Sequence, residues 1–221
     1  MWNVVLGPPG TGKTTYLLDK AEQFLESGVR PEKLGYVAFT KKAANEALTR
    51  AVEKFGYEPK ELTYFRTLHS LCYYWLGLGR SDVMARSNLR EFSKTIGERI
   101  NSAWDGENLM ALSSKGDTML ILENMARNRC VGVSEQWNGA DSNISWLHFD
   151  WFVKNYVNYK ESNFLIDYTD MLEMFLDSKG SPNLDVLIVD EAQDLSALQW
   201  RCVEKLAENV EHVYVAGDDD Q

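Results

Sequence analysis

The residues GPPGTGKTT at positions 7–15 have the types and spacing of a site that holds nucleotide phosphates. They fit the pattern G-x-x-x-x-G-K-[ST], in which glycines let backbone N–H groups converge on phosphate oxygens. Lys13 can reach the β- and γ-phosphates, and the Thr14 hydroxyl can ligate Mg²⁺. We therefore predict a nucleotide-binding loop made of Gly7, Pro8, Pro9, Gly10, Thr11, Gly12, Lys13, Thr14 and Thr15.

Two adjacent acids, Asp190 and Glu191, follow the apolar run LDVLIV at 184–189. A strand that ends in Asp190 can deliver a carboxylate to Mg²⁺, and Glu191 can polarise an attacking water. Adjacent acids are also common as solvated groups at a strand end. Because a phosphate loop lies in the same chain, the pair favours hydrolysis of a nucleoside triphosphate over binding alone.

Apolar runs alternate with helix-like segments around these residues. We predict strands at 3–6, 34–40 and 62–67, an apolar strand in LDVLIVDEAQD at 184–194 that runs out into acids, and a last strand in HVYVAGDDDQ at 212–221. We predict helices at 16–28, 41–56 and 196–210. Ser196 is a candidate N-cap, and Gly56 a candidate helix end. Alternating strands and helices predict an α/β fold with a parallel sheet covered by helices on both faces.

The middle of the chain, residues 78–163, shows helical periodicity in LREFSKTIGERI, DTMLILENMARN and WLHFDWFVKNYVNYKE but no convincing apolar strands. We interpret it as a helical subdomain inserted into the sheet domain. The predicted division is therefore a nucleotide-binding domain at 1–77 and 164–221, with the insertion at 78–163.

Composition sets limits on the class of protein. The chain has 221 residues, a net charge of −10 and three scattered cysteines. It contains no long apolar run and no secretory signal, so we predict a cytoplasmic protein with reduced thiols. The negative charge argues against a broad nucleic-acid-binding surface, although a few local lysines are enough for a narrow track along phosphates.

Several motifs resemble those of superfamily 1 helicases of the UvrD/Rep type. DEAQD at 190–194 is similar to that family's DExQD motif, and FTKKAANEA at 39–47 and TLHSL at 67–71 are similar to its motifs Ia and Ib. IDYTDML at 166–172 resembles the stretch after the inserted subdomain, and VAGDDDQ at 215–221 resembles motif III. The order of the motifs implies a RecA-like domain with a helical insertion.

The resemblance implies a role for each matching residue. Thr14 and Asp190 would hold Mg²⁺, Lys13 would contact the phosphates of ATP, Glu191 would activate water, and Gln221 would sense the γ-phosphate. Single-stranded DNA would contact Phe39, Thr40, Lys41, Thr67 and His69. From the residues alone, Phe39 can also be a buried strand residue, and His69 a capping or core histidine.

We therefore expect the N-terminal ATP-binding half of an ATP-dependent DNA helicase, which moves on single-stranded DNA. Two alternatives remain open: the N-terminal part of a helicase–nuclease subunit, and a non-motor nucleotide switch that binds a protein partner. The resemblance implies that a second motor domain, carrying an arginine finger, follows Gln221 in a longer protein. The 221-residue chain alone is then expected to be nearly inactive as an enzyme.

Overall fold

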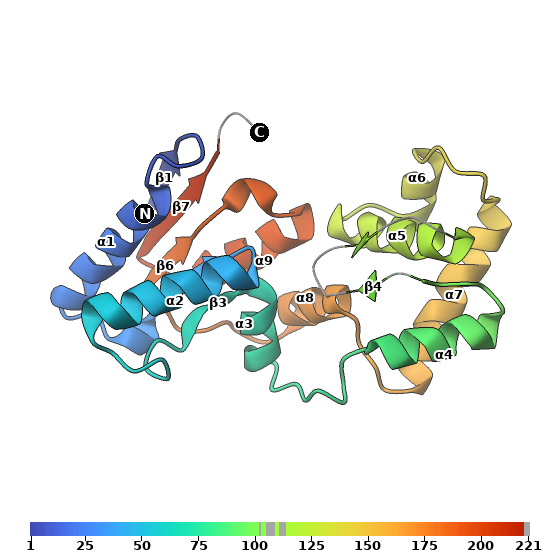
Figure 1. The fold of residues 1–221 in the computed structure, drawn as a ribbon, viewed down its shortest axis with the longest axis horizontal. Coiled ribbons are helices and arrows are strands. Elements are labelled where there is room, and N and C mark those ends of the chain that lie inside the picture. The colour runs from blue at the N-terminus through green and yellow to red at the C-terminus, as the bar shows by residue number, and fades with distance from the viewer. Residues whose placement is uncertain (102, 105–108, 111–113, 219–221) are drawn as a thin grey trace. The chain divides into compact units, whose positions relative to one another are not determined.

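The computed structural model describes residues 1–101, 103–104, 109–110 and 114–218. It divides into two compact units (Figure 1), of which the first comprises Met1–Leu76 with Phe175–Gln221 and the second comprises Gly77–Met174. The chain therefore leaves the first unit and later returns to it.

The first unit is built on a five-stranded sheet with the strand order β1-β7-β6-β2-β3. Every neighbouring pair in it is parallel, so the carboxyl ends of all strands lie at one edge. The strands are β1 (Trp2–Leu6), β2 (Leu34–Ala38), β3 (Tyr64–Thr67), β6 (Val186–Val189) and β7 (His212–Gly217). The α/β fold with a parallel sheet that the sequence predicts is confirmed.

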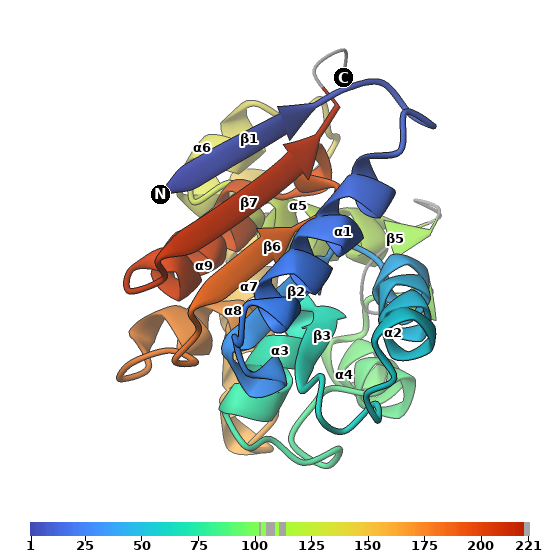
Figure 2. The ribbon, with the colours of Figure 1, turned by 90° about the vertical axis from the view of Figure 1, so that its left-hand side faces the viewer.

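Helices cover both faces of this sheet. Figure 2 shows α1 (Lys13–Glu26) and α2 (Lys41–Phe55) on one face and α9 (Ala197–Ala207) on the other. Because both faces are covered, β2 and β6 are buried along their whole length. The remaining elements of this unit are the short 3-10 helices η1 (Pro31–Lys33) and η2 (Ala192–Asp194), helix α3 (Leu68–Trp75) and the end of α8 (Tyr168–Asp177).

Helix ends follow from local chemistry. Gly56 ends α2 in the left-handed conformation, with a φ of 73°. Ser196 caps α9 by accepting a hydrogen bond from the backbone N–H of Gln199 at 3.2 Å. The helix end and the N-cap predicted from the sequence at these positions are both confirmed.

β2 is tightly packed at Gly35, near its amino end. A Cβ atom at this position of β2 would lie 2.8 Å from Cδ1 of Leu184 and 3.3 Å from Cδ1 of Leu187. Leu184 and Leu187 are themselves buried. A side chain at position 35 would therefore force these buried leucine side chains to move.

The second unit is mainly helical. Phe92, Met119, Leu120, Phe149 and Phe152 are fully buried in its apolar core. Its helices are α4 (Arg86–Ile96), α5 (Lys115–Asn128), α6 (Val133–Asn138), α7 (Trp146–Ser162) and the first part of α8. An antiparallel pair, β4 (Ala103–Trp104) with β5 (Leu109–Met110), departs from the prediction of a unit without strands. Strands of two residues are too short to show a periodic pattern.

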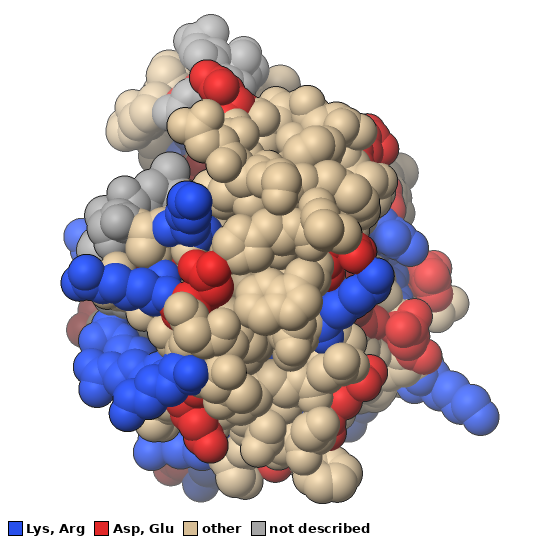
Figure 3. Space-filling model, turned by 90° about the vertical axis from the view of Figure 1, so that its right-hand side faces the viewer, with Lys and Arg blue, Asp and Glu red and all other residues tan. Residues whose placement is uncertain are grey.

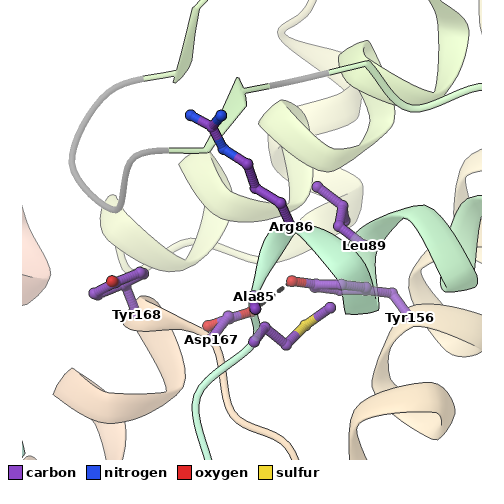
Figure 4. Close-up of a pocket in the computed structure, with 7 residues that line it drawn as sticks. Ala85, Arg86, Leu89, Tyr156, Asp167 and Tyr168 are labelled. Atoms are coloured by element: carbon purple, nitrogen blue, oxygen red, sulfur yellow. Dashed lines mark hydrogen bonds between the residues drawn. The ribbon is translucent and has the colours of Figure 1, made fainter. Parts of the chain in front are cut away.

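A buried group of ion pairs joins three helices of the second unit. Arg127 of α5 lies 3.1 Å from Asp167 and 2.5 Å from Asp170. Lys160 of α7 contacts the same two carboxylates at 2.7 and 2.6 Å. The hydroxyl of Tyr156 also donates to Asp167, at 3.0 Å (Figure 4).

These ion pairs explain why the division between the units differs from the predicted one. The sequence placed the return to the first unit between residues 163 and 164, whereas in the structure it falls after Met174, inside α8. Asp167 and Asp170 are held by cations of α5 and α7, so the start of α8 is part of the second unit. Partners this distant in sequence leave no local pattern from which the boundary could be predicted.

Charge is unevenly distributed despite the negative total. Figure 3 shows Lys and Arg side chains gathered along one side of one face of the molecule. On α4, the side chains of Arg86, Arg90 and Lys94 are exposed at four-residue intervals. Among the described residues, none of the helices has both the length and the apolar composition to cross a bilayer.

Candidate nucleotide and nucleic-acid site

The loop from Gly7 to Gly12 connects β1 to α1 at the carboxyl edge of the sheet. Gly10 and Gly12 adopt positive φ angles of 80° and 85°, a conformation that favours glycine. Pro8 accepts hydrogen bonds from the Thr11 hydroxyl at 2.8 Å and from its backbone N–H at 3.4 Å, which closes the turn. Gly12 is the N-cap of α1, whose first turn contains no acidic residue. The loop therefore presents the positive end of a helix dipole, as an anion site requires.

Lys13 lies back across this loop. Its ammonium group donates to the carbonyl oxygens of Gly7 and, at 3.3 Å, of Pro8. The side chain is half-buried, and its contacts come from the loop itself. The cation is thus held beside the backbone that would surround the phosphates. Thr14 and Thr15 follow in the first turn of α1.

Asp190 directly follows β6 and is 2% exposed. Its Oδ2 accepts a hydrogen bond from the Thr14 hydroxyl at 2.9 Å, and its Oδ1 accepts one from the backbone N–H of Glu191 at 3.0 Å. The structure thus brings together the two residues that the sequence assigned to one metal ion. A hydroxyl and a carboxylate are oxygen ligands of the kind that Mg²⁺ prefers, and they lie at the loop where phosphates would supply others. The residues present therefore fit a magnesium–nucleotide complex.

Glu191 has a strained backbone, with a φ of 53° and a ψ of 45°. A left-handed conformation in a residue other than glycine costs on the order of 1–3 kcal/mol. Its Oε2 accepts a hydrogen bond from Nε2 of Gln193 at 2.9 Å. Gln193 in turn accepts one from the backbone N–H of Asp218 at 3.1 Å. Gln193 therefore fixes the Glu191 side chain relative to the end of β7, a task that the sequence did not reveal.

Tyr36 is a second contributor that sequence reasoning missed. This residue lies in β2, and its hydroxyl donates to Oδ2 of Asp190 at 2.7 Å. Burial, together with the charge of Asp190, raises the pKa of this phenol far above its ordinary value. The available signal was a tyrosine in an otherwise apolar buried strand, because a buried phenol needs a hydrogen-bond acceptor.

The residues predicted to bind single-stranded DNA lie at or shortly after the carboxyl ends of two neighbouring β-strands. Ala38 of β2 is paired with Thr67 of β3, so the segments that begin at Phe39 and at Leu68 leave the same edge of the sheet. Thr40 caps α2 by accepting from the N–H of Ala43 at 3.1 Å. Thr67 caps α3 in the same way, from the N–H of Ser70 at 3.2 Å.

A pocket of ≈ 350 Å³ lies between α2 and β3. Arg66, which was not predicted from the sequence, is one of its polar lining residues. The others are Lys41, Asn45, Thr67 and Ser70. The guanidinium of Arg66 also lies 4.6 Å from the ring centre of Tyr74, an exposed aromatic side chain. Two cations beside hydroxyl groups make this pocket suited to a phosphate of a nucleic-acid strand.

Phe39 and His69 are not among the residues that line this pocket. Phe39, directly after β2, is half-buried. Burial and, to a smaller extent, the charge of Lys41 lower the pKa of His69 to about 4. An uncharged His69 at neutral pH can contribute hydrogen bonds or stacking to a strand but not a positive charge. Gln221 lies outside the described residues.

Known proteins similar to this chain are DNA helicases. It is 26% identical to a "Probable DNA helicase" of Mycoplasma pneumoniae, covering 99% of this chain and 44% of that protein. It is 25% identical to the "Putative ATP-dependent DNA helicase YjcD" of Bacillus subtilis, covering 99% of this chain and 30% of that protein. The chain thus spans less than half of the length of these relatives. The sequence profile of the UvrD/REP helicase N-terminal domain matches residues 2–221. The chain therefore belongs to the UvrD/REP helicase N-terminal domain family.

Proposed function

We propose that the chain is the N-terminal motor part of an ATP-dependent DNA helicase and that it binds and hydrolyses ATP with Mg²⁺. The observation that carries this proposal is the 2.9 Å hydrogen bond between Thr14 and Asp190 beside the loop at 7–12. The metal, when bound, offsets phosphate charge and orients the terminal phosphate. Thr14 and Asp190 hold it, and Lys13 contacts the phosphates.

Glu191 is the proposed general base of the reaction. Its carboxylate accepts from Gln193, which restricts its orientation and leaves acceptor capacity for a water molecule. Asp190, next to it, accepts two hydrogen bonds on Oδ2 and one on Oδ1, which leaves acceptor capacity on Oδ1 for a metal ion. The two acids therefore have different tasks, with Asp190 acting toward the metal and Glu191 toward water. Gln221 remains the proposed sensor of the γ-phosphate.

The second substrate that we propose is single-stranded DNA. Lys41 and Thr67 line one pocket at the carboxyl edge of β2 and β3, while Phe39, Thr40 and His69 lie on the segments that leave this edge. The same edge carries Asp190 at the end of β6, which is paired with β2. Single-stranded DNA bound there would lie over the β-strands next to the nucleotide site. This arrangement supports coupling of ATP hydrolysis to movement along DNA.

We further propose that catalysis at full rate needs a second motor domain. Relatives are longer than this chain: the match covers only 44% of the "Probable DNA helicase" of Mycoplasma pneumoniae. An arginine supplied across a nucleotide cleft is worth about 10³- to 10⁵-fold in phosphoryl transfer. We therefore expect this chain alone to bind nucleotide modestly, to hydrolyse it very slowly and to unwind no duplex.

The test compares ATP binding and turnover with and without a single-stranded oligonucleotide. We expect calorimetry to show Mg²⁺-dependent binding of ATP that Lys13→Ala weakens. Joining the chain to a second motor domain of a relative is expected to raise turnover by orders of magnitude and to make it depend on the oligonucleotide. Turnover that stays indifferent to DNA in the joined protein would instead favour a nucleotide switch.

A further inference from the structure

Tyr36 occupies the centre of β2, and its whole side chain is buried. The ring belongs to the apolar core of the first unit, while the hydroxyl reaches the carboxylate of Asp190 at 2.7 Å. A hydrogen bond to a charged acceptor is short and about twice as strong as one between neutral groups. This side-chain hydrogen bond of β2 is therefore directed at the candidate metal site.

The position of this hydroxyl is fixed by the surrounding sheet. The ring of Tyr36 stacks on that of Phe65, with centres 5.3 Å apart and an angle of 18° between the planes. The two residues are direct partners in the pairing of β2 with β3. On the other side, the backbone N–H of Asp190 donates to the carbonyl of Val37 at 2.9 Å. Both the main chain and the carboxylate of Asp190 are thus held by β2.

The groups that donate hydrogen bonds to Asp190 differ in their other interactions. Thr14 is itself a proposed metal ligand, so its hydroxyl oxygen has a second task. The hydroxyl of Tyr36 is buried and has its acceptor in Asp190. The backbone N–H of Glu191 binds the other carboxylate oxygen, Oδ1. Tyr36 is therefore the side chain that can keep Oδ2 oriented independently of Thr14.

We propose that Tyr36 is a positioning residue, which holds the Asp190 carboxylate in the orientation that Mg²⁺-dependent nucleotide binding requires. This inference rests on the proposed function of the site. Partners that orient a metal ligand from behind typically change metal affinity by about 10- to 100-fold when they are removed. The alternative is that Tyr36 only fills the core, in which case its loss changes stability but not metal dependence.

The test is Tyr36→Phe, which removes one oxygen atom and keeps the ring stack. Tyr156→Phe is the matched control, because its buried hydroxyl also donates to Oδ2 of an aspartate, Asp167 at 3.0 Å, in the second unit (Figure 4). Calorimetry of the 221-residue chain gives the dissociation constant of ATP in excess Mg²⁺ and in EDTA, and thermal melting gives the stability of each variant.

For Tyr36→Phe we expect the dissociation constant in Mg²⁺ to rise about tenfold, while the constant in EDTA stays at the wild-type value. Tyr156→Phe is expected to lower the melting temperature and to leave both constants unchanged. Phe65→Leu keeps the hydroxyl but loosens the stack. We expect it to raise the constant in Mg²⁺ by a smaller factor, again without an effect in EDTA.

Three results would overturn the inference. Equal weakening in Mg²⁺ and in EDTA would reduce Tyr36 to a packing role. Unchanged constants in Tyr36→Phe, beside Mg²⁺-dependent binding by the wild type, would refute the positioning role and leave the proposed function standing. A wild-type chain that binds ATP no better in Mg²⁺ than in EDTA would contradict both.

Discussion

The hydroxyl of Thr14 donates to Oδ2 of Asp190 at 2.9 Å, although the two residues are 176 positions apart in the chain. They meet because β1 and β6 are parallel strands of one sheet, so the segments that follow them lie at the same edge. Ligands of open α/β sheets bind outside the carboxyl ends of the strands. This pair therefore marks the place where nucleotide chemistry is to be tested.

Lys13→Ala is expected to weaken binding of Mg²⁺-ATP while leaving the fold intact. The ammonium contacts only loop carbonyls in the described structure, and its proposed partners are phosphates. A charge-assisted hydrogen bond contributes about 1.5–3 kcal/mol, which corresponds to roughly ten- to a hundredfold in affinity. Calorimetry checks this, with Lys20→Ala on the same helix as the control. Equal affinities for wild type and Lys13→Ala would exclude this role.

Substitutions of the two acids, Asp190 and Glu191, are expected to impair different steps. Asp190→Asn is expected to impair Mg²⁺-dependent binding of ATP, because a neutral amide is a poorer ligand than a carboxylate. Glu191→Gln is expected to retain binding and to lose about 10²- to 10⁴-fold in turnover, because the amide cannot accept a proton from water. Single-turnover release of phosphate, by the chain joined to a second motor domain, measures the second effect, with exposed Glu208→Gln as the control. Wild-type turnover in both site variants would show that the acids are wrongly assigned.

Lys41→Ala is expected to weaken binding of single-stranded DNA more than Lys42→Ala does. The two lysines are adjacent and both exposed, but only Lys41 lines the pocket with Arg66 and Thr67. Loss of one phosphate contact should reduce the salt slope of log K by about 0.7. Fluorescence anisotropy at several salt concentrations measures the slope. If both variants lose the same affinity, the pocket is not the site of contact.

Stability is expected to depend on pH through Glu123 of the second unit. This side chain is 2% exposed, and its Oε2 has no partner among the described residues. Burial is the main cause that raises its pKa from 4.5 to about 7. The folded protein therefore binds more protons than the unfolded chain between these values, so the stability contributed by Glu123 is fully present below pH 4.5 and is lost as the pH rises through about 7.

Glu123→Gln should remove this loss, so its stability relative to wild type should increase from pH 5 to pH 8. The shift sets an upper bound of roughly 3 kcal/mol for the change. Urea unfolding at a series of pH values measures it, and Glu161→Gln, at an exposed position, is the control. Parallel pH profiles for wild type and Glu123→Gln would show that Glu123 is not the titrating group.

The sequence predicted those features that local patterns determine. The strand into Asp190 and the glycine-rich turn before Lys13 have compositions that only a few local structures accommodate. The helix end at Gly56 and the N-cap at Ser196 follow from single residues. The edge at which Thr14 and Asp190 meet follows from the alternation of strands and helices.

Contacts between distant residues were not predictable in this way. The hydrogen bond from Tyr36 to Asp190 joins residues 154 positions apart, and that from Asp218 to Gln193 joins residues 25 positions apart. Neither contact leaves a periodic signal. The same holds for Arg127 with Asp170, which places the start of α8 in the second unit. Such contacts depend on how helices and strands pack together. That packing leaves no local pattern in a single sequence.

The tight contact at Gly35 and the exposed phosphate loop lie toward opposite ends of the strands. Near the amino end of β2, a methyl group at position 35 would lie 2.8 Å from Cδ1 of Leu184 and would force it to move. At the carboxyl ends of the strands, the loop residues Pro8 and Gly10 are exposed. Near Gly35 the sheet is thus closed by packing, whereas the loop at its carboxyl edge is open to ligands. Variation at the closed end should alter how firmly the protein folds, and variation at the open end should alter which chemistry it performs.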